Sequence, residues 1–288
     1  MTTLFTILNI LKLSFFKKMK FFSRAVFFTK EFESLFKTLN QDKLKSIIKL
    51  NPNIFLKPFR AYMFCNIKIS EKFKFLESHY SFLNKYFSEK AINKIYKNLN
   101  NTLLEAIIDE NYKIDVNLCY IGSLGKEGEL TLLLKLNEEE IYSIQFSFYE
   151  NSLIICGVQG RNTTNTEELK ELTKKMHGVR PRNLMFFILR QICEVLNIRN
   201  IEAIGSRNHV ANCSKVRNTN KFLANYDEYW EEEKANKEGD FYILSLIEQR
   251  KNMEEIPSKK RSMYKKRFEM LDNMKKNVKK NLLNLISL

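Results

Sequence analysis

The chain has 288 residues, 44% of them hydrophobic and 28% charged, with only 8 glycines and 4 prolines. This composition excludes wholesale disorder and argues against a turn-rich β-sandwich. The formal net charge of +15 is concentrated at the ends, because residues 1–60 carry +9, residues 241–288 carry +7 and the rest carry −1. Two cationic ends around a neutral body favour a polyanionic partner, namely an anionic membrane surface or a phosphorylated lipid. Nucleic acid is the weaker alternative, because no RNA-binding motif is present.

Residues 1–30 are apolar and are interrupted by lysines. Lys12 divides the apolar stretch and Lys17, Lys18 and Lys20 follow it, whereas a secretory signal carries its positive charge first. No apolar run approaches the ~20 residues that span a bilayer. On a helical period the apolar residues share one broad face, which either packs on the core or lies in an anionic membrane interface. We therefore expect a cytoplasmic protein, peripheral at the inner membrane in the second case.

Two helices are predicted before residue 100. Helical spacing of apolar residues predicts one over 31–50, ended by the Asn-Pro-Asn turn at 51–53, and another from about Ser70, its expected N-cap. His79 lies within the second helix, and we expect it to have a structural role rather than a catalytic one.

The five cysteines are widely spaced and form no C-x-x-C pair; they are Cys65, Cys119, Cys156, Cys193 and Cys213. An odd number without such spacing predicts reduced thiols in a reducing compartment. Three of the five lie inside apolar runs, where cysteine behaves as a small hydrophobic residue.

From about residue 110 the apolar period changes from helical to alternating. Four segments, at 112–121, 129–137, 140–150 and 151–160, are rich in β-branched and aromatic residues and are separated by short turns, which predicts an antiparallel meander. In 140–150 the apolar residues alternate with Ser143, Gln145 and Ser147, as expected of a sheet with one covered face.

After Gly160 the sequence predicts a helix from about Glu167 capped by Thr164 or Thr166, a buried helix over 182–198 and a strand at 201–206. This last strand is expected to lie parallel to a neighbour through a right-handed crossover. The predicted fold class is α+β, with a central, mostly antiparallel sheet, flanking helices and helical extensions at both ends. We divide the chain into a helical N-terminal region (1–105), a sheet-containing core (106–240) and a basic helical tail packed on the core (241–288).

Five separated segments match a known bacterial family in order. They are KPFRAYM at 57–63, LIICGVQGR at 153–161, LTKKMHGVRPRNL at 172–184, the run from SRNHV to KFLANYDEYW at 206–230, and EEIPSKKRSMYKKRFEML at 254–271. With these segments the chain resembles the VirK/YbjX family, a domain-of-unknown-function family of Gram-negative bacteria, over about residues 50–275. The resemblance implies an envelope-associated role in virulence and in resistance to cationic antimicrobial peptides, and it implies no particular reaction.

The first candidate site is the loop that follows the strand at 151–160. Gln159, Gly160 and Arg161 combine a glycine, backbone amides and a guanidinium group, which suits the phosphates of a cofactor. The loop and the strand pattern resemble those of N-acetyltransferase-like folds, which would make the cofactor acyl-CoA or acyl carrier protein. The segment RNTTNT at 161–166 lacks the further glycines of such a loop, so a plain turn is the alternative.

Two histidines are the candidate catalytic groups. His177 precedes Arg180 and Arg182, which places a group that titrates near neutrality beside two guanidinium groups suited to phosphate or carboxylate. His209 follows the strand at 201–206, where α/β folds place ligand groups. In the structural alternative, His177 caps a helix and the arginines pair with acidic neighbours. Two histidines fall short of a zinc site, and no metal is expected.

The tail contains a further cationic cluster. Lys259, Lys260 and Arg261 begin a basic segment that suits the phosphates of lipid or RNA, with a solvated helix face as the alternative. Three functions follow from these patterns: an envelope-associated factor of the VirK/YbjX type, an acyltransferase-like enzyme with a thioester donor, and an RNA-binding regulator.

Overall fold

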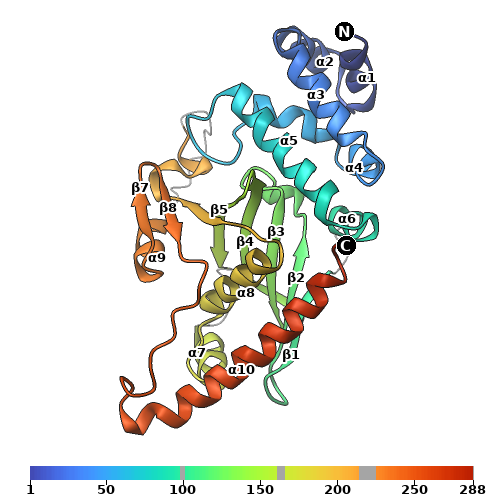
Figure 1. The fold of residues 1–288 in the computed structure, drawn as a ribbon. Helices are drawn as coiled ribbons and strands as arrows, with labels where there is room; N and C mark the ends of the chain where they lie inside the picture. Colours follow the sequence, from blue (N-terminus) through green and yellow to red (C-terminus); the bar gives the residue numbers. More distant parts are fainter. Residues whose placement is uncertain (98–100, 161–165, 214–224, 288) are drawn as a thin grey trace.

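The computed structural model describes residues 1–97, 101–160, 166–213 and 225–287. Its strands form one sheet in the order β1-β2-β3-β4-β5-β6-β8-β7, with helices before, within and after it (Figure 1). The predicted α+β fold class with a mostly antiparallel sheet is therefore confirmed. The strands are Thr102–Ile107 (β1), Lys113–Cys119 (β2), Leu130–Leu136 (β3), Glu139–Tyr149 (β4), Ser152–Gly160 (β5), Asn200–Ile204 (β6), Asn236–Glu238 (β7) and Phe241–Leu244 (β8).

Helices precede the sheet, connect its strands and close the chain. The α-helices are Thr2–Ile10 (α1), Phe15–Ala25 (α2), Thr29–Leu39 (α3), Lys45–Leu50 (α4), Ile69–Tyr86 (α5), Glu89–Tyr96 (α6), Thr166–Lys175 (α7), Pro181–Val195 (α8), Tyr226–Glu232 (α9) and Ser258–Leu283 (α10). Short 3₁₀ segments are Val26–Phe28 (η1), Pro52–Phe59 (η2), Gly122–Leu124 (η3), Ser206–Asn208 (η4) and Val210–Asn212 (η5).

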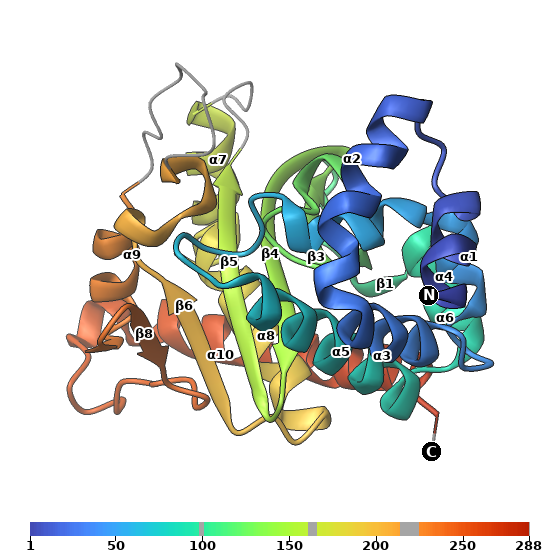
Figure 2. The ribbon, with the colours of Figure 1, turned by 90° about the horizontal axis from the view of Figure 1, so that it is seen from above.

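Among the described strands, the antiparallel order of the sheet is interrupted between β5 and β6. β1 to β5 are antiparallel neighbours in sequence order, which confirms the predicted meander. β6 then lies parallel to β5, after a connection that contains α7 and α8, as the sequence predicts. The two strands pair only from Ser152 to Ile155, although β5 continues to Gly160. Figure 2 shows them spreading apart toward their carboxyl ends.

Helices cover both faces of the sheet, and both ribbon views show this (Figures 1 and 2). The N-terminal helices, with α5 against β4, form one layer, and α8 and α10 form the other. α8 belongs inside the molecule because its apolar residues surround the helix rather than form a stripe. Six consecutive residues from Leu184 to Leu189 are buried. Such a helix is stable only between the sheet and a second helix, which is α10.

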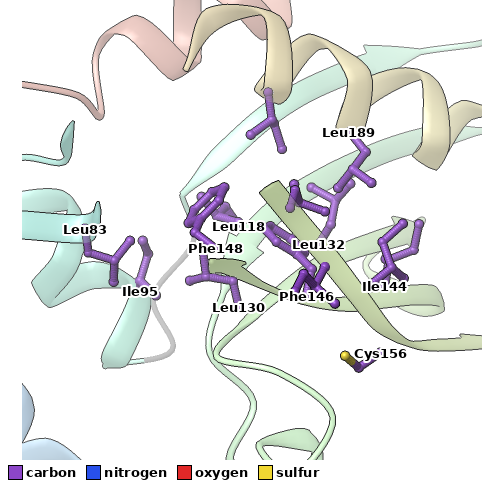
Figure 3. Packing of buried hydrophobic residues seen from close by; sticks show 14 of the residues in the cluster. Leu83, Ile95, Leu118, Leu130, Leu132, Ile144, Phe146, Phe148, Cys156 and Leu189 are labelled. Atoms are coloured by element: carbon purple, nitrogen blue, oxygen red, sulfur yellow. The ribbon is translucent and has the colours of Figure 1, made fainter. Parts of the chain in front are cut away.

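The hydrophobic core is continuous across these layers. In Figure 3, Leu132 and Ile144 of the sheet lie near Leu189 of α8, while Leu83 of α5 and Ile95 of α6 approach from the N-terminal layer. The sheet and both helical layers therefore depend on one another for burial of their apolar surface.

Some local expectations differ from the structure. The helix predicted over 31–50 is two helices, α3 and α4, and α5 begins at Ile69 rather than at an N-cap at Ser70. Lys68 takes the N-cap position, and its backbone N–H donates to the Glu71 carboxylate at 2.9 Å. β1, β7 and β8 have no counterpart in the predicted elements. The sheet uses residues on both sides of the boundaries expected at 105 and 240, and those domain boundaries stay a prediction.

Within the described parts of the chain, no helix is both long and apolar enough to traverse a bilayer.

Candidate functional site

A stripe of polar side chains on β4 lies buried rather than exposed. Ser143, Gln145 and Ser147 are all covered by the N-terminal layer and by the segment at 121–129 that precedes β3. The expectation of a sheet with one covered face was therefore wrong, because helices that the alternation does not reveal cover the polar face as well. Buried polar groups need partners, so this face concentrates the polar chemistry of the molecule.

Glu127, in the segment that covers the stripe, is an acidic group close to Gln145. The carboxylate is almost completely buried, and Gln159 Nε2 of β5 donates to its Oε2 at 2.6 Å. Burial raises the pKa of Glu127, although the hydrogen bond from Gln159 opposes the shift. A carboxylate with a raised pKa accepts a proton more readily than an exposed one, so Glu127 has the properties of a general base.

A glycine makes room for this group. A side-chain carbon at Gly157 would lie 2.4 Å from Gln145 Oε1 and 2.5 Å from Glu127 Oε2. Only glycine therefore allows the carboxylate and the two glutamine side chains to converge over β5. Gln145 Nε2 donates to Ser143 Oγ at 2.9 Å, while its buried Oε1 has no hydrogen-bond partner among the described residues.

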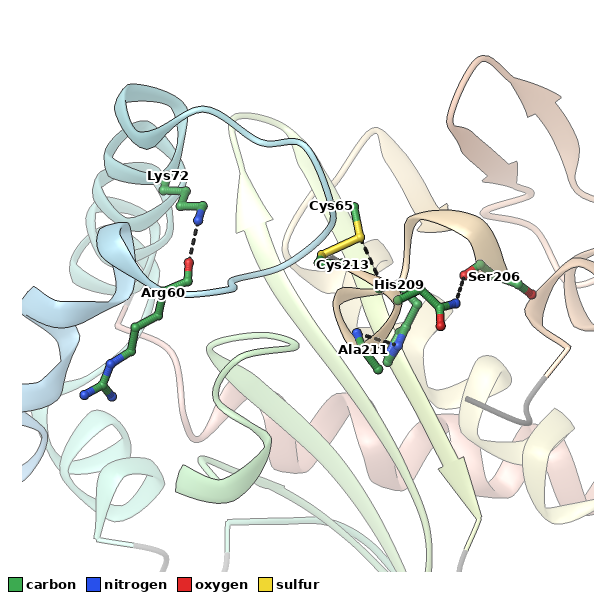
Figure 4. The surroundings of a disulfide bond; sticks show 8 residues. Arg60, Cys65, Lys72, Ser206, His209, Ala211 and Cys213 are labelled. Atoms are coloured by element: carbon green, nitrogen blue, oxygen red, sulfur yellow. Dashed lines mark hydrogen bonds between the residues drawn. A yellow bond between two sulfur atoms is a disulfide. The ribbon is translucent and has the colours of Figure 1, made fainter. Parts of the chain in front are cut away.

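His209 approaches Glu127 from the segment after β6. Its Nε2 lies 3.9 Å from Glu127 Oε1, and its Nδ1 accepts a hydrogen bond from the Ala211 backbone at 3.2 Å (Figure 4). Because Nδ1 accepts, the neutral ring carries its proton on Nε2, which faces the carboxylate. Burial lowers the pKa of His209 to about 4, so the imidazole is neutral near pH 7.

The edge of β5 beyond β6 is open to side-chain hydrogen bonding. The Val158 N–H donates to the Tyr226 hydroxyl at 2.7 Å, and that hydroxyl donates to the Val158 carbonyl at 3.1 Å. Tyr226 belongs to α9, which is attached to the end of β6 because Trp230 Nε1 donates to the Ile204 carbonyl at 2.7 Å. The backbone groups that β6 leaves unpaired are thus met by a hydroxyl group, within the same region as Glu127 and His209.

A cavity adjoins the cluster on the side of β4. Its volume is about 360 Å³, and Gln159 and Gly160 line it together with Tyr142, Ser143 and Glu140. The Gln159 amide also contacts Glu127, so the Gln159 side chain lies between the cavity and the carboxylate.

A second acidic group, Glu129, lies two residues along the same face. Its carboxylate is completely buried and pairs with Lys57 Nζ at 2.5 Å and with the Tyr80 hydroxyl at 2.6 Å. Burial alone would raise the pKa of Glu129, but the Lys57 ammonium group lowers it below its usual value. His79 next to this pair has its pKa lowered to about 4 by burial, and its Nδ1 accepts from the Phe148 N–H. This agrees with the structural role expected of His79. The Lys57–Glu129 pair joins η2 to the sheet.

A disulfide links the segment after η2 to the segment that carries His209. Cys65 and Cys213 are bonded, with a Cα–Cα distance of 5.2 Å (Figure 4). The Cys65 N–H donates to the Asn208 carbonyl at 2.9 Å. The prediction of five reduced thiols was wrong for these two, because folding brings together cysteines 148 residues apart. Cys119, Cys156 and Cys193 are free and buried. A disulfide is more typical of oxidising compartments, so the cytoplasmic location stays a prediction.

Reduction of this disulfide should destabilise the protein. A bond that closes so long a loop restricts the unfolded chain, and we expect its loss to lower the free energy of unfolding by about 2–4 kcal/mol. Urea unfolding with and without a thiol reductant measures the effect, and titration of the unfolded, unreduced chain should find the three free thiols. The Cys65→Ser/Cys213→Ser variant is the control and should not respond to reductant. Equal stability of the oxidised and reduced wild type would contradict the expectation.

The structure groups some of the predicted site residues and separates others. Gln159 and His209 meet around Glu127, and Gly160 lines the adjoining cavity. His177 lies elsewhere: it follows α7 at positive φ, and its carbonyl accepts from Arg267 Nε of α10 at 2.8 Å. Arg161 lies outside the described residues, as do Thr164 and the loop around it.

The predicted anion-binding arginines have acidic partners. Arg180 and Arg182, at the start of α8, both pair with Glu232 of α9, and the Arg182 guanidinium lies over the Tyr229 ring. In the tail, Arg261 Nε donates to the Ile256 carbonyl at 3.0 Å, while Lys259 and Lys260 are exposed on the first turn of α10. These side chains lie outside the cluster around Glu127.

Sequence reasoning missed the acidic residues at the centre of the site. Glu127 and Glu129 lie in one short segment, and their partners Gln159, Lys57 and Tyr80 come from three others. The available signal was the pair of glutamates at i and i+2 just before an apolar strand, because an extended backbone would place both side chains on one face of the sheet.

The fold and the cluster together define an α+β protein with one mostly antiparallel sheet. Its buried polar site lies where β5 and β6, the parallel pair among the described strands, separate. A family model described as "Protein of unknown function (DUF535)" matches residues 12–280. The chain therefore belongs to this family, and the predicted VirK/YbjX membership is confirmed.

Curated relatives agree with this assignment. The chain is 26% identical to "Uncharacterized protein YbjX" of Escherichia coli over 80% of its own length and 72% of that protein. Two uncharacterized proteins of Haemophilus influenzae are each 33% identical, over 58% and 53% of this chain and 57% and 51% of their own lengths. The matched segments thus span about half of the two Haemophilus proteins. No solved structure matches the chain.

Proposed function

We propose that this chain is an acyltransferase-like enzyme that moves an acyl group from a thioester donor to an acceptor of the cell envelope. One observation carries the proposal: β5 extends beyond its pairing with β6, and the buried base Glu127 lies beside that part of the strand. Ligands of α/β folds bind at the carboxyl ends of strands where the strand order changes.

The edge of β5 that β6 leaves, which the Tyr226 hydroxyl occupies at Val158, suits a donor that replaces this hydroxyl. The arm of coenzyme A and of acyl carrier proteins is an extended chain with two amides, which can pair with a strand edge as a further strand would. Val158 offers both its N–H and its carbonyl toward the β6 side, where the Tyr226 hydroxyl bonds them in the structure. Gln159 and Gly160 follow directly and lie next to where the thioester end would reach.

Glu127 and His209 suit the acceptor. Glu127 takes the proton of an attacking amine or hydroxyl, the new bond forms to the thioester carbonyl carbon, and the carbon–sulfur bond breaks. The departing thiolate then takes up a proton from solvent, to which Glu127 releases its own. His209 directs an N–H toward the Glu127 carboxylate, and the Gln159 amide holds that carboxylate in place by a hydrogen bond. Both are positioning residues for the base.

The family resemblance supports an acceptor in the envelope. The resemblance to VirK/YbjX proteins supports a role in virulence and in resistance to cationic antimicrobial peptides, and acylation of an envelope component that carries amines or hydroxyls would alter how such peptides bind. The RNA-binding alternative predicts a steep dependence of RNA association on salt concentration and stays a prediction.

Donor binding provides the test. Calorimetry on the full chain with acetyl-CoA and a long-chain acyl-CoA should give dissociation constants of about 1 μM to 1 mM, typical of enzyme substrates. 3′,5′-ADP, which lacks the pantetheine arm, should bind at least about tenfold more weakly, because it cannot pair with β5. If no acyl-CoA binds and no acyl group leaves an acyl carrier protein, the proposal fails.

A further inference from the structure

The second helix of the chain exposes aromatic side chains. Phe15, Phe16 and Phe27, on and just after α2, have 72%, 83% and 81% of their surface exposed, and Met19 between them has 52%. Other apolar residues of the same stretch, such as Leu11, are buried in the core. The chain changes course between α1 and α2. One part of residues 1–30 therefore packs on the core, while another part faces outward. Clustered exposed aromatic groups on a folded protein mark an interaction surface.

A cationic pocket lies beside this exposed face. It has a volume of about 240 Å³ and is lined by four basic side chains, Lys17, Lys20, Arg24 and Arg60, with apolar residues between them. Among the residues that the structure describes, no carboxylate lines it, and residues 1–30 contain no acidic residue. The pocket therefore has the size and charge for one phosphate-bearing group.

Parts of the pocket are held in place by the fold. The Arg24 guanidinium lies 4.4 Å from the centre of the Phe59 ring. The Arg60 backbone is fixed because its carbonyl accepts from Lys72 Nζ of α5 at 2.5 Å (Figure 4). In the same view the Arg60 side chain points away from α5. The Arg24 guanidinium and the Arg60 backbone are thus positioned before any ligand arrives.

We propose that α2 docks on an anionic phospholipid bilayer, with Phe15, Phe16 and Phe27 inserted into the interface and the phosphate of one lipid head group in the pocket. Aromatic side chains beside lysines and arginines are the composition of helices that lie in a membrane interface. Each basic residue near an anionic surface adds to the attraction, which falls within a Debye length. This surface is separate from the proposed transfer site, and neither depends on the other.

The geometry favours lipid over RNA. A single-stranded RNA site needs a basic groove that follows several nucleotides, with aromatic rings along it on which successive bases stack. Here the pocket has room for one phosphate group, and the aromatic residues project from the outer side of a helix.

Vesicle co-sedimentation of the full chain tests the proposal. Binding to phosphatidylcholine vesicles with about 30% phosphatidylglycerol should exceed binding to pure phosphatidylcholine at least about tenfold at low salt, and it should fall as salt is raised. Phe15→Ser/Phe16→Ser/Phe27→Ser should lower the partition coefficient at least about tenfold. Ile107→Ser/Ile247→Ser is the matched control, because these residues are 78% and 76% exposed on other surfaces, and it should bind as the wild type does.

Charge reversal separates the two cationic ends of the chain. Lys17→Glu/Lys20→Glu should reduce anionic-vesicle binding by about tenfold or more, while Lys265→Glu/Lys266→Glu in α10 should change it much less. Glycerol phosphate in solution should not displace the vesicles, because it lacks the acyl chains that the phenylalanines contact; displacement by it would point to a free phosphate compound as the ligand.

Three results would overturn the proposal. One is equal binding to neutral and anionic vesicles, or to none. Another is loss of binding in the α10 variant with retention in the α2 variants. The third is salt-dependent binding of single-stranded RNA that the α2 variants lose, without vesicle binding, which would assign the surface to RNA instead. All variants change exposed side chains, so circular dichroism should show the wild-type fold.

Discussion

Glu127→Gln should lower the rate of acyl transfer about 10²- to 10⁴-fold while leaving donor affinity nearly unchanged. The amide keeps the size of the side chain but cannot accept a proton from the acceptor, which is the contribution of a general base. Burial raises the pKa of Glu127, and the carboxylate is the active form, so the wild-type rate should rise as pH increases through that raised pKa. The variant should lack this rise. Thiol release from acyl-CoA, with phosphatidylethanolamine or a lysine peptide as acceptor, measures both effects.

Two controls separate the role of Glu127 from a general loss of fold. Glu105→Gln makes the same chemical change at an exposed pair with Lys113 on β1 and β2, and it should keep the wild-type rate. Gly157→Ala should act as Glu127→Gln does, because the added carbon meets the carboxylate, whereas Gly122→Ala meets its nearest atom at 4.0 Å and should be harmless. Wild-type turnover in Glu127→Gln, or an unchanged pH profile, would remove Glu127 from the mechanism. Donor binding is tested separately, by calorimetry with acyl-CoA.

Lys57→Met should lower the free energy of unfolding by about 3–5 kcal/mol, the usual cost of leaving a buried charge without its partner. Glu129 would keep the Tyr80 hydroxyl and a neutral His79 near it, but no cation of its own among the contacts just described. The effect should be largest above the ordinary pKa of a glutamate, because the folded pKa of Glu129 is lowered in the wild type and its contribution to stability disappears as pH falls through that pKa. Urea unfolding followed by circular dichroism and by the fluorescence of Trp230 measures it.

The double variant Lys57→Met/Glu129→Gln distinguishes charge from packing. The glutamine retains an acceptor for Tyr80 but carries no charge, so the double variant should recover much of the stability that Lys57→Met loses. Lys113→Met breaks an exposed pair and should cost less than about 1 kcal/mol. If Lys57→Met were no more destabilising than Lys113→Met, the buried pair would not be what joins η2 to the sheet.

The proposed activity and the proposed membrane surface lie in different parts of the molecule. The cluster around Glu127 belongs to the sheet and its covering segments, and the exposed phenylalanines belong to α2. A variant that loses vesicle binding should therefore still bind acyl-CoA, and Glu127→Gln should still bind vesicles. This independence means that either proposal can fail without the other.

Elements whose apolar pattern is local were predictable from sequence. The alternation in 140–150 marks β4, and the apolar run at 184–189 marks α8 as a buried helix, because neither pattern needs knowledge of distant residues. β1 and the short β7 and β8 were not found, since their pairing partners rather than their own sequences make them strands. For the same reason Gln159 and His209 were identified only as separate candidates.

The sequence by itself determined the α+β class, the order of the meander, the parallel return of β6 and the concentration of positive charge at the two ends. Only the tertiary structure decided that the polar face of β4 is buried, that Glu127 lies beside Gln159 and His209, and that Cys65 pairs with Cys213. The division has a physical cause. Periodicity and charge are properties of neighbouring residues, whereas burial and side-chain pairing depend on which distant segments pack together.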